Sequence, residues 1–185
     1  MIKNSSLVYG SVAIFFHWFM ALGVFFMFGL GLYMVELSYY DAWYKGSLDL
    51  HKSTGVILFL CLCARLFWRI VNVSPNFLPA QTQFEKFEFR VAHLVHLLLY
   101  LMMILLMTSG YLISTADGRS ILVFELIEVP AISSFIENQE DIAGEIHLIL
   151  AWCLIGFVAL HSGAAVKHHF FNKDNTFKKM LGIEN

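Results

Sequence analysis

Residues 145–169, EIHLILAWCLIGFVALHSGAAVKHH, decide the fold of this chain, because two histidines lie inside one long apolar stretch. His147 and His161 are fourteen residues apart. A helix advances about 100° and rises about 1.5 Å per residue, so both side chains return to nearly the same face, about 21 Å apart. A hydrocarbon core is about 30 Å thick, and ionisable residues inside it are rare and usually functional. The stretch therefore predicts a membrane helix that presents two imidazoles at two depths.

The composition places the chain among membrane proteins. It has 185 residues, of which 58% are hydrophobic and 14% are charged, with a mean hydropathy of +0.68. Soluble domains have about 45–50% apolar and about 25% charged residues. The net charge is −2 and no basic block is present, so nucleic acid is excluded as a partner. The three cysteines form neither C-x-x-C nor C-x-x-C-H, which excludes covalent attachment of a c-type haem.

Four apolar segments are long enough to span a bilayer, which needs about 20 residues each. They cover about residues 7–35, 51–73, 91–114 and 142–166. The first run is longer than the apolar region of a signal peptide and lacks an obvious cleavage site. We predict an all-α integral membrane protein, a four-transmembrane-helix bundle that forms a single membrane domain over residues 1–185.

The distribution of Lys and Arg predicts the orientation. With a cytoplasmic N-terminus, nine basic residues lie inside: Lys3, Arg65, Arg69, Lys86, Arg90, Lys167, Lys173, Lys178 and Lys179. Only Lys45, Lys52 and Arg119 lie outside. This excess agrees with the positive-inside rule. We therefore predict a multi-pass membrane protein with both termini cytoplasmic.

The predicted depth of each side chain in the membrane groups the four histidines of the apolar segments into two pairs. In this orientation His51 and His147 lie near the outer ends of their helices, and His17 and His161 lie nearer the inner ends. Each pair can fill both axial positions of a haem iron, and the core of a helix bundle is where such cofactors are held. The sequence thus predicts two non-covalent b haems, with His17, His161, His51 and His147 as axial ligands of the iron.

Two other interpretations apply to the same histidines. A single histidine in a membrane helix can simply hydrogen-bond to a neighbouring helix. Zinc also binds histidine, but each level offers only two ligands where zinc uses three or four. The sorting of four histidines into two pairs at matched depths favours haem over both.

The same residues resemble a known family. The segments FFHWFMALGVFF (15–26), DLHKSTGVILFLCLCARLFWRI (49–70), FRVAHLVHLLLYLMMILLMTSGYLIS (89–114) and the continuation of the opening stretch to KHHFFNKDNTFKKML (167–181) are similar to the bacterial cytochrome b561 family. The resemblance covers nearly the whole chain in order. It implies four transmembrane helices in the bacterial inner (cytoplasmic) membrane, two b haems on the four histidines named above, and electron transfer involving ubiquinone. It also implies a superoxide oxidase type of enzyme, a superoxide:ubiquinone oxidoreductase that takes electrons from superoxide at the outer side.

Three further histidines are candidates for a quinone site. His93 and His96 lie three residues apart at the start of the third segment, on one helical face. His168 follows the last segment. We predict that they bind ubiquinone or relay protons near the inner haem, since histidine titrates near neutrality. Packing and headgroup contact at the membrane surface are the alternative for each.

The predicted outer side is acidic, which bears on the electron donor. It carries ten Asp and Glu against three Lys and Arg, a charge that would repel superoxide. Three functions therefore stay open. In the first, the chain transfers electrons from superoxide to ubiquinone. In the second, it is an electron-transfer subunit for a periplasmic redox protein that docks on the acidic loop. In the third, it is a non-redox transporter or metal-binding membrane protein. Its remaining expected partner is membrane lipid.

Overall fold

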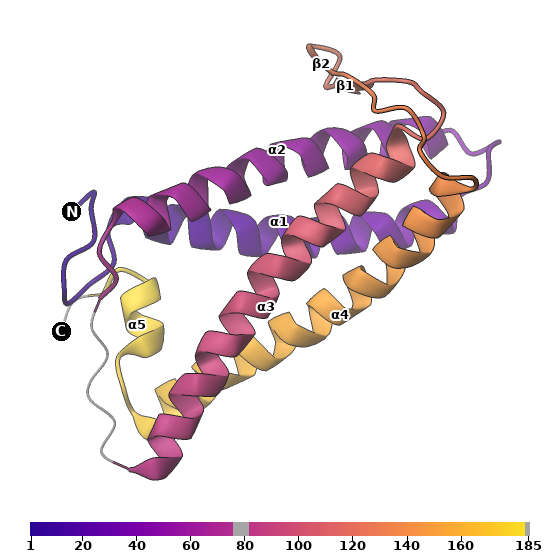
Figure 1. Cartoon of the computed structure of the whole chain (residues 1–185). Helices are drawn as coiled ribbons and strands as arrows, with labels where there is room; N and C mark the ends of the chain where they lie inside the picture. The colour runs from indigo at the N-terminus through magenta and orange to yellow at the C-terminus, as the bar shows by residue number, and fades with distance from the viewer. Residues whose placement is uncertain (76–81, 184–185) are drawn as a thin grey trace. The chain divides into compact units, whose positions relative to one another are not determined.

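A computed structural model describes residues 1–75 and 82–183, in which four long helices dominate (Figure 1). Their bounds are Ser11–Val35 (α1), Tyr44–Val71 (α2), Gln83–Ser114 (α3) and Gln139–Lys167 (α4). Within the described residues these four helices are long and apolar enough to cross a membrane. The predicted all-α fold with four candidate membrane spans is confirmed.

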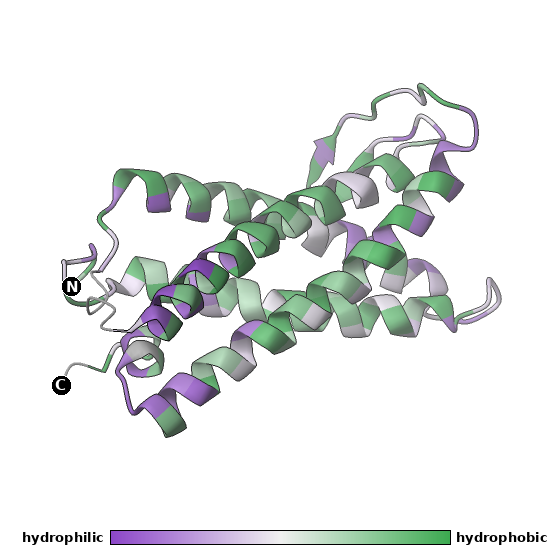
Figure 2. Ribbon diagram, turned by 60° about the horizontal axis from the view of Figure 1, so that its bottom comes forward, coloured by the Kyte–Doolittle hydropathy of each residue, from purple (hydrophilic) through white to green (hydrophobic). Residues whose placement is uncertain are grey.

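Helices α2, α3 and α4 begin before the predicted apolar runs, whereas α1 begins at Ser11 rather than at the predicted residue 7, and α2 ends at Val71 rather than at residue 73. Helix α2 begins at Tyr44 and α3 at Gln83, where the sequence is still polar. At the start of α3, the Thr82 hydroxyl accepts the backbone N–H of Glu85 at 3.1 Å, and the Glu85 carboxylate accepts the N–H of Thr82 at 3.3 Å. This reciprocal cap satisfies two backbone donors that a helix leaves free. Hydropathy marks only the apolar part of such a helix, as the colouring of Figure 2 illustrates.

Four short elements were not predicted. Strands β1 (Ile121–Val123) and β2 (Ile127–Val129) form an antiparallel hairpin in the segment between α3 and α4. A short π-helix, η1 (His168–Asn172), follows α4 directly, and α5 (Thr176–Met180) follows it.

The chain divides into two compact units. Unit 1 comprises Met1–Phe19, Cys63–Met102 and Cys153–Asn185, and unit 2 comprises Met20–Leu62 and Met103–Trp152. Each unit contains part of all four long helices, so the chain passes from one unit to the other within each helix. The nine basic residues predicted to lie inside all belong to unit 1, and the three predicted to lie outside belong to unit 2.

Unit 2 buries small polar side chains whose hydrogen bonds stay within the unit. Ser53 is buried and accepts the backbone N–H of Phe124 at 3.0 Å, which fixes the hairpin to α2. Gln139 at the start of α4 is buried and donates to the Leu112 carbonyl at 3.1 Å. Buried polar groups are costly unless they are paired, so these contacts hold the loop against the helix ends.

Unit 1 is closed by the C-terminal segment. The indole N–H of Trp18 in α1 donates to the Met180 carbonyl in α5 at 2.8 Å. A β-carbon on Gly182, which has a positive φ of 71°, would lie 3.3 Å from Ile14. Lys167 at the end of α4 forms an ion pair with Glu88 in α3. The first two contacts join the C-terminal segment to α1, and the ion pair joins α3 to α4 within unit 1.

Candidate functional site

Each unit contains one pair of histidines from different helices. In unit 1, the ring centroids of His17 on α1 and His161 on α4 are 6.1 Å apart, with 56° between the ring planes. In unit 2, the centroids of His51 on α2 and His147 on α4 are 6.2 Å apart, with 66° between the planes. The structure therefore brings together both pairs that the sequence predicts.

The spacing of both pairs suits a metal ion between the rings. A bond from a metal to an imidazole nitrogen is about 2 Å long, and the nitrogen lies about 1 Å from the ring centre, so two axial imidazoles have centroids about 6 Å apart. Zinc sites use three or four protein ligands, and within residues 1–75 and 82–183 no group of three or more His, Cys, Asp or Glu is placed to hold a bare metal ion. Two imidazoles from different helices suit an iron whose other positions a porphyrin fills.

The unit 2 pair has surroundings that prepare it for ligation. His147 Nδ1 lies 3.0 Å from the Leu106 carbonyl oxygen and 3.1 Å from the Ser109 hydroxyl. A carbonyl only accepts, so Nδ1 carries the proton and Nε2 keeps its lone pair. A ligating histidine usually makes such a bond with its second nitrogen. His51 Nδ1 is buried and has no hydrogen-bond partner in the described part of the chain.

Two glycines leave room for the rings of the unit 2 pair. A β-carbon on Gly110 would lie 3.0 Å from Cε1 and 3.3 Å from Nδ1 of His147. One on Gly31 would lie 3.6 Å from Cε1 of His51. The first distance is tighter than ordinary contact, so Gly110 sets how closely α3 approaches the His147 ring.

The unit 1 pair has a cation and a third histidine beside it. Arg65 Nη2 is 3.2 Å from His17 Nδ1. The guanidinium only donates, so in this arrangement Nδ1 accepts and the proton of His17 lies on Nε2. Binding of a metal through Nε2 requires the tautomer of His17 with its proton on Nδ1, and Arg65 must then move away from Nδ1. His96 on α3 lies beside the pair, with its ring centroid 5.1 Å from that of His161.

Two arginines and an aromatic ring extend this basic environment. The guanidinium carbons of Arg65 and Arg69 each lie 5.4 Å from the ring centroid of Tyr100. Burial raises the pKa of the Tyr9 hydroxyl, and Arg69 opposes that rise. Cations over an aromatic face gain about 0.5–2 kcal/mol. The side chain of Tyr100 therefore helps to hold two positive charges near His17.

The three histidines predicted for a quinone site have different contacts. His96 lies beside His161, whereas His93 is exposed and its Nδ1 is 2.8 Å from the Phe89 carbonyl. His168 is held by Asp174, with 2.7 Å between Nδ1 and the carboxylate. His96 is thus the one of the three that contacts the histidine pair.

A family model for prokaryotic cytochrome b561 matches residues 8–182. The chain belongs to the prokaryotic cytochrome b561 family. The family implies a multi-pass membrane protein that binds b-type haem and transfers electrons, and these general properties apply to this chain.

Curated relatives agree with this membership. The chain is 44% identical over 174 residues to "Cytochrome b561 homolog 2" of Escherichia coli (strain K12), which covers 94% of this chain and 91% of the relative. It is 27% identical over 138 residues to "Cytochrome b561 homolog 1" of the same organism, covering 72% and 73%. It is 28% identical over 142 residues to "Probable superoxide oxidase CybB" of Yersinia pestis, covering 77% of each.

Sequence reasoning missed several residues that shape the cytochrome's two sites. The partners of His147, the Leu106 carbonyl and the Ser109 hydroxyl, lie in an apolar run without distinctive features. Gly110 was named only as one of several glycines where a porphyrin could approach the backbone, and its closeness to His147 was not predicted. Asp174 lies beyond the last span, and only its short distance from His168 in sequence hinted at the contact. From the sequence, Arg65 was a candidate partner for the haem propionates or a basic anchor at a helix end, and its contact with His17 was not predicted.

Proposed function

We propose that this cytochrome holds two b haems, one between His17 and His161 and one between His51 and His147, and transfers electrons across the bilayer to ubiquinone. The observation that carries the proposal is the recurrence of one pair geometry, with centroids 6.1 and 6.2 Å apart, once in each unit. When bound, each haem would take up and release one electron at a time. Both axial positions of each iron would be filled, which favours electron transfer over oxygen binding.

The residues around each pair have separate tasks in this proposal. The Leu106 carbonyl and the Ser109 hydroxyl orient His147 and keep its proton on Nδ1. In unit 1 the cationic Arg65 and Arg69 would face the carboxylates of the haem, since a partly buried cation is stabilised by a nearby anion. Arg65 would then leave Nδ1 of His17 free to carry its proton.

Ubiquinone is proposed at unit 1, near His93, His96 and His168. Reduction of one quinone takes two electrons and two protons. His96 supports this placement by its position beside His161, 5.1 Å between centroids. The His168–Asp174 pair can hold a proton at Nδ1 of the histidine, at the end of α4.

Superoxide is the proposed electron donor at unit 2. Two superoxide ions would give two electrons and leave as two molecules of oxygen, and one ubiquinone with two protons would become ubiquinol. The relative named as a probable superoxide oxidase supports this donor. The charge distribution supports an inner-membrane location with unit 1 on the cytoplasmic side. A soluble redox protein is the second candidate donor, because the acidic charge of unit 2 opposes the approach of an anion.

Haem quantitation with stopped-flow kinetics tests the function. Protein in ubiquinone-containing liposomes should hold two haems per chain and pass electrons from added potassium superoxide to ubiquinone. A reproducible value of one haem in fully loaded protein would contradict the two-site proposal. Haem reduction without quinone reduction would contradict the proposal that ubiquinone is the electron acceptor.

Separate substitutions test the quinone site. His96→Gln and His168→Gln should each slow ubiquinone reduction while haem content and haem reduction by the donor persist. Trp43→Phe in unit 2 is a control that should leave all three unchanged. Native quinone turnover in both histidine variants would contradict the proposed site.

A further inference from the structure

The hairpin of unit 2 holds apolar side chains outside the candidate membrane spans. Ile121 and Val123 on β1 are buried at 5% and 3% exposure, so one face of the hairpin packs onto the unit. Leu122 on the other face, Phe124 and Leu126 in the turn, and Ile127, which pairs with Val123, are exposed, and Leu126 is 84% exposed. A clustered, exposed apolar surface usually marks an interaction site.

The backbone of the turn is strained and anchored. Phe124 and Glu125 have φ values of 47° and 61°, in the left-handed region that side chains other than glycine rarely adopt. Such residues cost about 1–3 kcal/mol each and persist only where the surroundings hold them. Here the N–H of Phe124 is bound by Ser53, and the Tyr111 hydroxyl donates to the Pro130 carbonyl at 2.6 Å. The hairpin therefore presents Phe124 and Leu126 in a fixed position.

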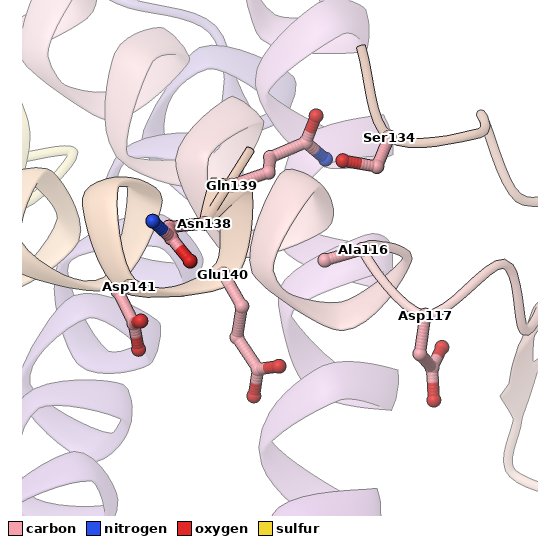
Figure 3. Close-up of a pocket in the computed structure, with 7 residues that line it drawn as sticks. All are labelled: Ala116, Asp117, Ser134, Asn138, Gln139, Glu140 and Asp141. Carbon is pink, nitrogen blue, oxygen red and sulfur yellow. The ribbon is translucent and has the colours of Figure 1, made fainter. Parts of the chain in front are cut away.

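Acidic residues accompany this apolar surface. Glu125 and Glu128 belong to the hairpin segment and are exposed. In the same α3–α4 segment, a cavity of about 260 Å³ is lined by Asp117, Glu140 and Asp141 among others. Figure 3 shows these three side chains extending to the same side of the cavity. The volume is below the roughly 300–1,000 Å³ of small-molecule sites, and it suits the charged end of a single lysine or arginine.

Unit 2 as a whole has the same sign of charge. Its residues include ten Asp and Glu and three Lys and Arg, a formal difference of −7. Of the three cations, Lys52 and Arg119 are paired with Asp49 and Asp117. An apolar centre with a charged rim is the arrangement of a transient protein interface, in which charge steers the encounter. Anionic lipid headgroups would be repelled by the same charges.

We propose that the β1–β2 hairpin and its acidic surroundings are the docking surface for a soluble electron-transfer protein with a basic face. The proposal rests on the electron-transfer function proposed above and adds a partner to it. Ser53, which binds the hairpin, lies two residues after His51 on α2. A protein seated on the hairpin would thus lie at the helix end that carries His51. In each encounter the partner's redox centre would lose one electron, and the haem of unit 2 would gain it.

The test uses the haem-loaded protein in nanodiscs and a reduced, basic mitochondrial-type cytochrome c as the probe. Binding and electron transfer are measured separately, at low and at high ionic strength. Glu125→Gln should weaken binding about threefold at low ionic strength and have little effect at high salt, because exposed charges are screened. Leu126→Ser should weaken binding about threefold at both, because the loss is apolar.

Matched controls lie on the other loop of unit 2. Glu36→Gln makes the same change of charge and Tyr40→Ser removes an apolar side chain that is 94% exposed. Both should leave binding within about 1.5-fold of the native value, as expected for changes outside the interface. Equal effects of Glu125→Gln and Glu36→Gln would show only general charge attraction and would overturn the docking surface. Equal effects of Leu126→Ser and Tyr40→Ser, or no binding at low ionic strength, would overturn it too.

A superoxide measurement separates this proposal from the proposed function. Superoxide is an anion, so Glu125→Gln should not slow its reaction, whereas the same change slows the cationic protein. If the native protein fails to reduce ubiquinone with either donor but still binds the probe through Glu125 and Leu126, the function is wrong and the docking surface stands. If superoxide supports turnover and the probe does not bind, the function stands and the docking surface is wrong.

Discussion

Units 1 and 2 hold histidine pairs of nearly equal spacing in opposite electrostatic surroundings. Unit 2 has ten acidic and three basic residues, and its His147 is held by neutral partners, a carbonyl and a hydroxyl. Unit 1 has nine basic and four acidic residues, and a guanidinium contacts its His17 directly. The comparison teaches that pair geometry alone does not make two sites equivalent.

The opposite net charges of the two units predict different reduction potentials for the two proposed haems. A reduced haem carries one more negative charge than an oxidised one, so nearby cations favour reduction and nearby anions oppose it. The haem proposed for unit 1 should therefore have the higher reduction potential. Electrons that enter at unit 2 would move towards the unit where ubiquinone is proposed.

Removing one ligand from each unit should have the largest effect. We expect His51→Ala and His17→Ala each to lower the haem content from two to one per chain, because a lone axial histidine on an iron is a weaker anchor. Pyridine haemochrome assays give the number, and a redox titration shows which potential is lost. The high-potential haem should disappear in His17→Ala and the low-potential haem in His51→Ala.

His93→Ala is the matched control for these variants. His93 is exposed and bonded to its own helix, so both haems should remain. Loss of both haems from each ligand variant would mean that the sites do not load independently, and the comparison between units would lose its basis.

Spacing in the sequence was sufficient to predict the pairs but not their surroundings. The fourteen-residue interval and the four apolar runs predict the helices and the partners of each histidine, because helical periodicity is local. The contact of Arg65 with His17 depends on a long, flexible side chain reaching another helix. The hairpin has strands of only three residues, held by Ser53 from a distant part of the chain. Such features depend on tertiary contacts, which periodicity does not record.

Gly110→Ala should have the next largest effect and should be confined to unit 2. The added methyl would lie 3.0 Å from Cε1 of His147 and must displace the ring by a few tenths of an ångström. Crowding in packed regions costs about 1–3 kcal/mol. We expect haem to leave the unit 2 site about five- to tenfold faster, measured by transfer to apomyoglobin.

Gly156→Ala provides the control for that substitution. It lies on α4 in unit 1, and a β-carbon there would meet no atom within 4 Å among the described residues, apart from its chain neighbours and the backbone of its own helix. Haem release should match the native protein. Equal acceleration by both variants would indicate a general loss of helix packing rather than contact with His147.

Arg65→Gln should change the potential of one haem without removing it. Loss of a cation beside His17 should lower the unit 1 potential by about 40 mV, equivalent to about 1 kcal/mol for one electron. Spectroelectrochemical titration resolves the two components, and the unit 2 component should not move. Arg90→Gln, an exposed position on α3 of the same unit, should shift the potential much less. Equal shifts in both components would show that the two units do not have separate electrostatic environments.

The smallest expected effect concerns the pH at which Asp41, one of the acidic residues of unit 2, loses its charge. Hydrogen bonds from the hydroxyl and the backbone N–H of Ser38 lower the pKa of Asp41 below its ordinary value of 3.8. A carboxyl whose pKa is lowered by folding stabilises the folded loop above pH 3.8, and this contribution is lost as the pH falls through the lowered value. Ser38→Ala should raise the pKa towards 3.8, read from the carboxyl carbon shift of labelled aspartate by NMR. Ser134→Ala in the other loop should leave it unchanged. An unaltered titration in Ser38→Ala would show that the Ser38 hydroxyl does not keep Asp41 charged.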